Sequence, residues 1–304
     1  MMPQNLTIEK IEEGCIQCLT YFGIFKYPLT TSEIHAFNPC PASEYDIQDA
    51  LSKLVSEGKI FQHEGYFISE NDVEWVKERK KGNLQARQLL KKSGKYVSII
   101  ASFPFVKGIA ISGALSKFYA GDKPDIDYFI ITNSNRLWIA RTFLHLFKKL
   151  TFLTGHQHYF CMNYFIDMSA LEISNRNQYT AIETATILPV YNMELNQKFI
   201  EANKWFREFL PNYPTRIHDD YLIKDSKRPF KAIAEFVINH LFPEKLNNFL
   251  MNLTDKKWRR KWSGHNYNEY DYRRSFQTEI HISKNHPADY EKKIMKAFNE
   301  GTKT

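Results

Sequence analysis

Residues 105–132 read FVKGIAISGALSKFYAGDKPDIDYFIIT, and this stretch decides the fold. The first eight residues are mostly apolar and predict a strand, and the last six predict a second one. Between the two strands, Gly113 begins a turn that leads into a short helix. Asp125 and Asp127 then stand at the entry to the second strand. A strand, a glycine turn, a helix and a strand in this order predict an α/β unit.

Asp125 and Asp127 are two residues apart, so in an extended chain their carboxylates point to the same side. Like charges at that spacing repel unless a cation lies between them or one carboxyl is protonated. Mg²⁺ prefers carboxylate oxygens and usually keeps phosphate and water as its other ligands. Gly113 at a helix start allows close backbone approach to a phosphate. The pattern predicts metal-dependent nucleotidyl transfer from an NTP, and the alternative is an Asp-x-Asp that only caps a strand.

The N-terminal part predicts three helices and a hairpin. Apolar spacing predicts helices over 7–22 and 43–59, and a Thr/Ser cluster before Glu33 can cap a helix between them. Residues 60–69 predict a hairpin, so the unit is typical of a winged helix. The third helix carries more acids than lysines, which argues against sequence-specific DNA binding because phosphate contacts need Lys and Arg.

Further along the chain, helical spacing predicts helices over 71–104 and 136–150, and 158–167 predicts a third strand. From residue 174 the pattern is helical again. Its densest basic segment, DKKWRRKW at 255–262, mixes cations with tryptophans in a way that suits single-stranded RNA or a phosphate-rich acceptor. The alternative is a helix whose tryptophans pack inward while its charges are solvated.

The segment ISGALSKFYAGDKPDIDYFIIT resembles the signature of the DNA polymerase beta-like nucleotidyltransferase superfamily: a strand, Gly-Ser, a short helix, and Asp-x-Asp entering the next strand. Through YFGIFKYPLTTSEI, RLWIARTFLHLFKKL and YFCMNYFID, the chain is also similar to bacterial nucleotidyltransferase-domain proteins of unassigned role. The resemblance implies an α+β protein in three parts. These are a winged-helix-like domain (1–70), a nucleotidyltransferase α/β domain with leading helices and a small mixed sheet (71–173), and a helical C-terminal region with a basic tail (174–304).

The resemblance also implies roles for acidic residues. Asp125 and Asp127 would hold Mg²⁺ or Mn²⁺ as catalytic carboxylates. A third carboxylate usually comes from a later strand, and Asp167 is the nearest acid, although Asn163 can occupy that place as a neutral ligand.

The nucleotide phosphates are expected beside Ser112, Gly113, Ser116 and Lys117. Two positions depart from the family pattern. The serine that follows the glycine is Ala114 here, and the second small residue is Phe118. Both departures weaken the expected binding of a triphosphate.

Composition limits the class of protein. Hydrophobic residues make up 43% and charged residues 25%, which is typical of a globular chain, and the net charge of +7 favours an anionic partner such as nucleotide or nucleic acid. No apolar run reaches the roughly 18 residues of a membrane span, and the first residues lack an apolar signal core. We therefore expect a cytoplasmic protein without a membrane partner. Cys15 and Cys18 form C-x-x-C within a predicted helix, where core packing is favoured over redox or zinc chemistry.

The sequence thus predicts a Mg²⁺-dependent nucleotidyltransferase that moves a nucleotide from an NTP to a hydroxyl of an acceptor. The acceptor is a protein, a small molecule, a sugar or RNA. The alternative is a catalytically degenerate protein of the same fold that binds nucleotide or RNA without chemistry. The two aspartates favour the enzyme, and Ala114 and Phe118 favour the alternative.

Overall fold

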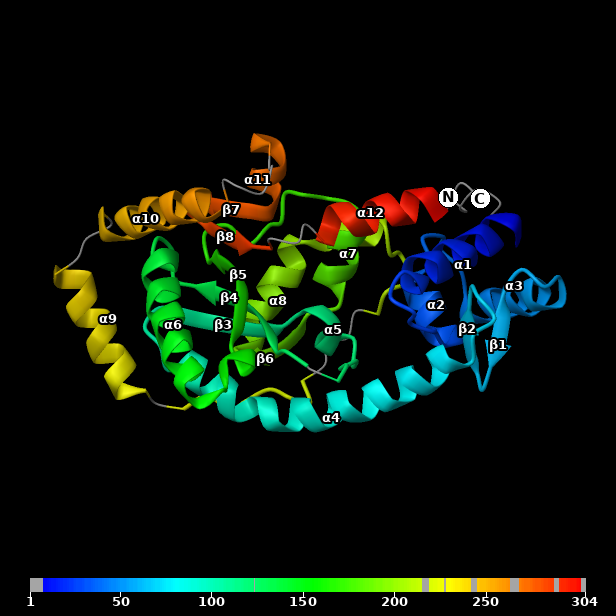
Figure 1. Cartoon of the computed structure of the whole chain (residues 1–304), viewed down its shortest axis with the longest axis horizontal. Helices are drawn as coiled ribbons and strands as arrows, with labels where there is room; N and C mark the ends of the chain where they lie inside the picture. The colour runs from blue at the N-terminus through cyan, green and yellow to red at the C-terminus, as the bar shows by residue number, and fades with distance from the viewer. Residues whose placement is uncertain are drawn as a thin grey trace.

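The chain forms a mixed α+β structure with one large and one small sheet (Figure 1). The computed structural model describes residues 8–122, 124–214, 219–226, 228–241, 245–262, 268–286 and 290–301. Its elements are, in chain order, α1 (Ile8–Gly23), α2 (Thr31–Phe37), α3 (Glu44–Ser56), β1 (Phe61–His63), β2 (Tyr66–Ile68), α4 (Glu74–Ala101), β3 (Val106–Ile111), α5 (Gly113–Ser116), β4 (Asp127–Thr132), α6 (Leu137–Thr151), η1 (Phe152–Thr154), η2 (Gln157–Tyr159), β5 (Cys161–Asp167), α7 (Gln178–Ala185), β6 (Leu188–Tyr191), α8 (Met193–Ala202), η3 (Lys204–Glu208), α9 (Pro229–Leu241), α10 (Lys245–Trp262), α11 (Glu269–Ser275), β7 (Phe276–Glu279), β8 (Ile282–Asn285) and α12 (Tyr290–Gly301). The predicted fold class, α+β, is confirmed.

The large sheet has six strands in the order β6-β3-β4-β5-β8-β7. β4 pairs with β5 in parallel, and every other neighbouring pair in this sheet is antiparallel. β4 is therefore an interior strand. Its five residues from Tyr128 to Thr132 are all buried, as expected for a strand covered on both faces.

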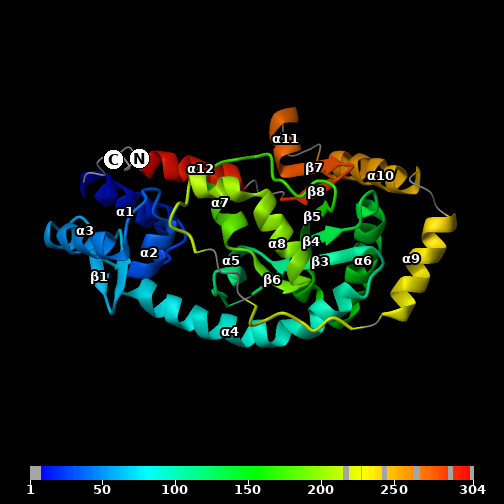
Figure 2. The same ribbon diagram turned by 180° about the vertical axis from the view of Figure 1, so that it is seen from behind.

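Alternate residues of β4 face two different helical layers. Phe129 and Ile131 pack in the core that includes α7 and α8, whereas Tyr128 and Ile130 pack in the core formed with α4 and α6. Figure 2 shows α7 and α8 in front of the sheet. Because side chains alternate along a strand, Asp127 at the start of β4 faces the α7 and α8 side.

The N-terminal helices and the small sheet are held to the rest of the chain by α4, which runs along the lower edge in Figure 1. Arg79 on α4 is buried, donates to the carbonyl oxygen of Pro28 and lies 2.5 Å from the Glu33 carboxylate. Its guanidinium also lies 4.1 Å from the ring centre of Tyr27. Glu33 and Thr30 form the predicted capping box of α2.

The expectation of a purely helical region after residue 174 is wrong for three segments. β6, β7 and β8 lie in this region and join the large sheet, so the sheet extends across the expected boundary at residue 173. β6 is a buried run of four residues that begins soon after α7 ends. Its apolar residues continue the helical spacing of α7, so the sequence pattern predicted helix there. β7 and β8 are short and partly polar, because they form one edge of the sheet.

Cys15 and Cys18 are buried in the core of the N-terminal part, and burial raises the pKa of the Cys15 thiol to about 12. The interpretation of the C-x-x-C pair as core residues is therefore supported over redox chemistry, which needs an accessible thiolate. Among the described residues, no helix is both long and apolar enough to cross a membrane.

Removing the Arg79 side chain should destabilise the protein. Arg79→Leu leaves the Glu33 carboxylate and the Pro28 carbonyl without their cationic partner. Since Glu33 is partly exposed, we expect a loss of about 2–3 kcal/mol, below the range for a fully buried pair. The measurement is chemical denaturation, with Arg87→Leu on the exposed side of α4 as the control. An equal loss in both variants would contradict this role of Arg79.

Candidate functional site

A cavity of about 980 Å³ opens at the start of β4, on the face of the sheet that carries α7. Its walls come from the large sheet, α1, α7, α11 and α12. Tyrosine and phenylalanine rings supply much of the lining. Ser112, Gly113, Lys117, Asn163 and Glu183 line it together with Asp127, and charged residues of other segments, among them Arg273, Arg274 and Lys284, line it as well. Large apolar cavities with a few convergent polar groups are the usual form of ligand sites.

Gly113 and Asp127 approach each other closely in the wall of the cavity. Gly113 has a φ of +68°, and a Cβ atom there would lie 2.9 Å from Oδ2 of Asp127. The backbone N–H of Ser112 donates to the carbonyl oxygen of Asp127 at 2.9 Å, which fixes the two segments against each other. Glycine suits this position, because a side chain there would be strained at this φ and would have to displace the Asp127 carboxylate.

Asn163 lies beside Asp127 because β5 contains a bulge. Tyr128 pairs with Met162 and Phe129 pairs with Tyr164, so Asn163 is the extra residue. Its side-chain amide donates to Oδ1 of Asp127 at 3.4 Å. The structure therefore places Asn163 where the sequence left a choice between Asn163 and Asp167.

Asp167 does not reach this site. It ends β5 and pairs with Thr132, five residues along the strand from Asp127, which is about 16 Å. Its buried carboxylate accepts hydrogen bonds from the backbone N–H groups of Asn135 and Ser169, and it pairs with Nδ1 of His281 at 2.8 Å. Asp167 thus holds loops together at the other end of the strands from Asp127, and the expectation that it supplies the third carboxylate does not fit the geometry.

Asp127 is half-buried, and burial raises the pKa of its carboxyl group above the ordinary value. The Cys161 thiol lowers this pKa by hydrogen bonding, whereas the charges of Asp125 and Glu183 raise it further. Asp125 itself is exposed and precedes the strand. Burial, followed by the charge of Asp127, raises the pKa of Cys161 to about 12, so this residue stays a thiol. The site concentrates negative charge, which favours a bound cation.

Glu183 is a site residue that sequence reasoning missed. It lies on α7, and its carboxylate pairs with Nζ of Lys117 at 2.8 Å. Nζ of Lys117 also donates to the carbonyl oxygen of Gly113 at 3.2 Å. Lys117, which was expected to meet phosphates, is therefore held by an acid. The only sequence signal for Glu183 is its spacing of four residues from Tyr179, which lines the same cavity.

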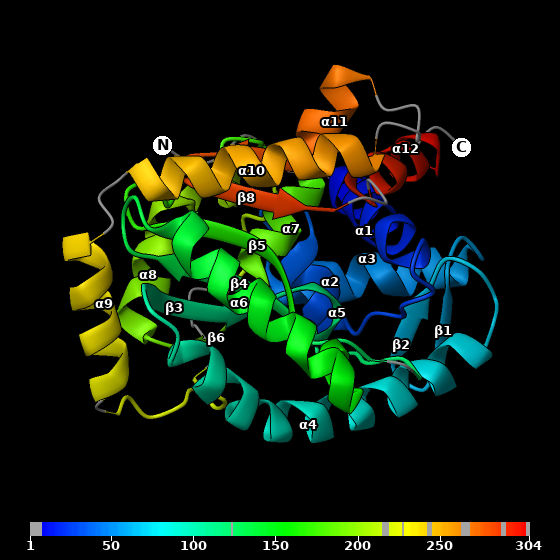
Figure 3. The same cartoon turned by 60° about the vertical axis from the view of Figure 1, so that its left-hand side comes forward.

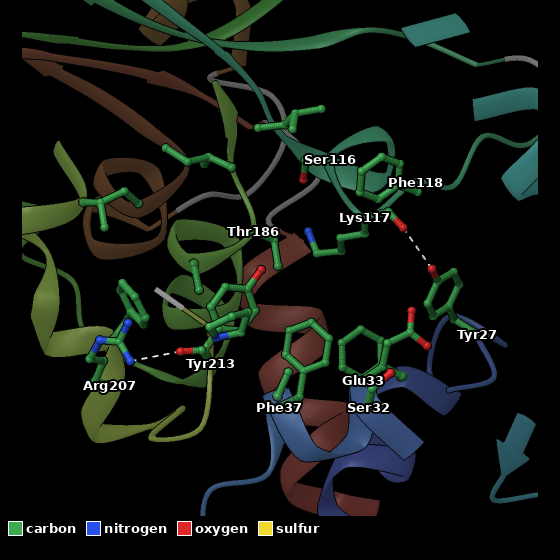
Figure 4. Close-up of a pocket in the computed structure, with 18 residues that line it drawn as sticks. Tyr27, Ser32, Glu33, Phe37, Ser116, Lys117, Phe118, Thr186, Arg207 and Tyr213 are labelled. Atoms are coloured by element: carbon green, nitrogen blue, oxygen red, sulfur yellow. Dashed lines mark hydrogen bonds between the residues drawn. The ribbon is translucent and has the colours of Figure 1, made fainter. Parts of the chain in front are cut away.

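A smaller cavity of about 380 Å³ adjoins the first, with Lys117 in the wall of both. Figure 4 shows the Lys117 side chain extending toward Thr186, while the Tyr27 hydroxyl donates to the Lys117 carbonyl oxygen at 2.9 Å. Ser116 and Phe118 line only this smaller cavity, and Oγ of Ser116 donates to the carbonyl oxygen of Gly113. The structure thus brings Ser112, Gly113 and Lys117 to the large cavity and separates Ser116 from it.

The basic segment 255–262 does not present its tryptophans for stacking. Trp258 is buried in a small core, and Trp262 stacks on Phe276 with ring centres 5.5 Å apart. Arg259 pairs with Asp255 at 2.8 Å and also with a carboxylate on α11. The inward-packed helix is therefore the correct interpretation, and the stacking platform expected for RNA is absent from this segment.

No protein-family model, curated protein or solved structure matches the chain. Within the described ranges there is also no group of three or more His, Cys, Asp or Glu side chains that could hold a metal ion. Any metal at Asp127 would depend on ligands from a substrate, as is usual for Mg²⁺.

The raised pKa of Asp127 can be tested by measuring how the free energy of unfolding depends on pH. Between the unfolded and folded pKa values the folded protein binds more protons, so stability falls as pH rises through that interval. Asp127→Asn avoids this loss. We expect it to be more stable than the unchanged protein by about 0.5–2 kcal/mol at neutral pH, a common gain when a functional-site residue is replaced. The difference should shrink as pH falls below the interval.

The measurement is chemical denaturation across a pH series, with Asp49→Asn as the control because Asp49 is exposed on α3, outside the cavity. A destabilised Asp127→Asn protein at neutral pH, or a difference that does not change with pH, would contradict this description of the site.

Proposed function

We propose that the chain is a Mg²⁺-dependent nucleotidyltransferase that transfers a nucleotide from an NTP to a hydroxyl group of an acceptor. The observation that carries the proposal is the half-buried Asp127 carboxylate with a raised pKa, which contacts Gly113 in the wall of a large cavity. Groups with perturbed pKa values in a cavity are typical of functional sites. The sequence order around them resembles that of the nucleotidyltransferase superfamily, with the departures at Ala114 and Phe118.

In this proposal Asp125 and Asp127 hold Mg²⁺ or Mn²⁺, and the phosphates of the NTP supply further ligands. The donor set fits, because carboxylate and phosphate oxygens are the ligands that Mg²⁺ prefers. Burial, more than the neighbouring charges, raises the pKa of Asp127, and a cation held by Asp125 and Asp127 would favour its charged form and supply charge stabilisation for the departing pyrophosphate. Gly113 leaves the space for the Asp127 carboxylate and lets the backbone approach the phosphates.

Lys117 and Glu183 exchange partners when the NTP binds. The phosphates attract Nζ of Lys117, which then leaves the Glu183 carboxylate. Glu183 becomes free to accept the proton of the acceptor hydroxyl. The hydroxyl oxygen bonds to the α-phosphorus, and the bond from that phosphorus to pyrophosphate breaks. This supplies the basic group that Asn163 cannot provide from β5.

The remainder of the large cavity is the acceptor site in this proposal. Tyr21 and Phe22 of α1 and Phe25, just after this helix, line it, so in this proposal the N-terminal winged-helix-like part positions the acceptor instead of reading DNA. The acceptor is a protein, a small molecule, a sugar or RNA, and the reaction takes place in the cytoplasm, where NTPs are available.

A second candidate function is nucleotide or RNA binding without chemistry. Ala114 is exposed in the cavity wall and offers no hydroxyl to a phosphate, and Asn163 brings a neutral amide beside Asp127. Ala114 thus weakens the hold on a phosphate, and Asn163 offers no basic group for catalysis, so a protein of this kind would bind its ligand without reacting with it.

The decisive assay incubates the purified protein with each of the four α-labelled NTPs and Mg²⁺ or Mn²⁺, and measures pyrophosphate release and label transfer. We expect one or more NTPs to react. The rate of pyrophosphate release should fall about 100-fold or more in Asp127→Asn, as for the loss of a key electrostatic group. Asp49→Asn on the exposed side of α3 is the control. NTP binding without product would favour the second candidate, and failure to bind either NTP or Mn²⁺ would contradict both.

Ala114→Ser should strengthen NTP binding. Its hydroxyl would stand in the cavity wall beside Gly113, and one added hydrogen bond contributes about 0.5–1.5 kcal/mol. Calorimetric titration with NTP and Mg²⁺ measures the change, and Ala232→Ser, exposed on α9, is the control. Unchanged or weaker affinity would show that the phosphates do not contact this turn.

A further inference from the structure

Helix α9 exposes its apolar face to solvent. Five large apolar side chains of this 13-residue helix are exposed: Phe230 (86%), Ile233 (60%), Phe236 (63%), Val237 (42%) and Leu241 (66%). Figure 3 shows α9 at the rim of the molecule, and Ile238 on its inner side packs against the small core that contains Ile139 and Ala140 of α6. Exposed apolar surface on this scale marks an interaction site in a stable protein.

Polar side chains fix this orientation from the inner side. The Lys231 ammonium donates to the carbonyl oxygen of Ala101 at 2.9 Å and to that of Val106. The Glu235 carboxylate accepts from the backbone N–H of Phe105 at 2.7 Å and pairs with Lys107 at 3.2 Å. α9 is therefore held at several points, and its outward face is a fixed feature of the fold.

The exposed residues of α9 include no lysine, arginine, aspartate or glutamate. Helices that lie on lipid surfaces carry Lys and Arg beside the apolar stripe, where these residues meet anionic head groups. In α9 the single lysine is buried against the protein. A charge-free apolar face is instead typical of the core of a protein–protein interface.

We propose that α9 is a homodimer interface, in which the apolar stripe of one chain packs against the same stripe of a second copy around a two-fold axis. Two copies with a net charge of +7 each repel one another over most approaches, and the charge-free stripe removes that repulsion where they meet. A stripe without charges is also complementary to itself, which an isologous interface requires.

The area of the stripe is adequate for this role. Taking about 150–250 Å² for a whole aromatic side chain, the five exposed side chains present on the order of 500 Å² of apolar surface. A stable interface buries roughly 800 Å² on each partner, including its polar rim. The stripe thus supplies more than half of the surface needed, and this proposal does not depend on the proposed enzymatic function.

The test is sedimentation equilibrium of the full chain over a concentration series. We expect the unchanged protein to be a dimer and Phe236→Asp to weaken dimerisation by about 30-fold or more, the effect of losing a central interface residue. The control is Leu153→Asp, because Leu153 is 86% exposed on η1, far from α9 in sequence. Circular dichroism should show the same fold in all three proteins, because both side chains are exposed.

A second measurement is independent of interface strength. Val237→Cys places a thiol near the middle of the stripe, and oxidation should link two chains through it, whereas Ser98→Cys on the exposed side of α4 should not cross-link. A protein that stays monomeric at every concentration would overturn the proposal. So would equal weakening by Leu153→Asp, or a monomer that binds phosphatidylserine vesicles through Phe236, which would identify α9 as a lipid-binding helix.

Discussion

The close approach of the Asp127 carboxylate to Gly113 is the constraint on which the candidate site depends. Backbone pairing continues from β3 and β4 to Ser112, so the turn must begin where the carboxylate already occupies the space of a Cβ atom. Glycine at positive φ satisfies both demands and directs α5, with Lys117, along the cavity wall. In the isolated chain this arrangement is unfavourable, because Asp127 is partly desolvated near Asp125 and Glu183. A protein that retains such a group gives up stability at this position, which is typical of functional sites.

Local patterns were sufficient to predict much of the framework. The predicted strand over 127–132 coincides with β4, since an uninterrupted short apolar run between Asp127 and the polar residues from Thr132 onward has few alternatives. The helix predicted over 136–150 agrees with α6 to within one residue at each end, because its apolar stripe is long and regular. Gly113 was recognised as a special position, although the reason was an expected phosphate and the structure adds a neighbouring carboxylate.

Long-range pairing could not be predicted in the same way. β7 and β8 are short, partly polar strands, and only their place at the sheet edge makes them strands. The parallel pairing of β4 and β5 determines why Asp167 does not reach Asp127 as a third carboxylate. β4 and β5 run in parallel. Asp127 at the start of β4 and Asp167 at the end of β5 therefore lie at opposite ends of the strands. No local signal in the sequence marks the bulge in β5 that brings Asn163 to Asp127. The same holds for the packing of α7, which brings Glu183 to Lys117.

Helix α9 shows why periodicity alone does not give orientation. An amphipathic pattern identifies two faces, and the usual rule places the apolar one inward. Here the last carbonyl group of α4, at Ala101, and the N–H of Phe105 need partners at the end of a long helix. Lys231 and Glu235, four residues apart on α9, supply them. Once the polar face satisfies those backbone groups, the apolar stripe has to point away from the chain. The exposed stripe thus follows from the way α9 supplies partners to the end of α4.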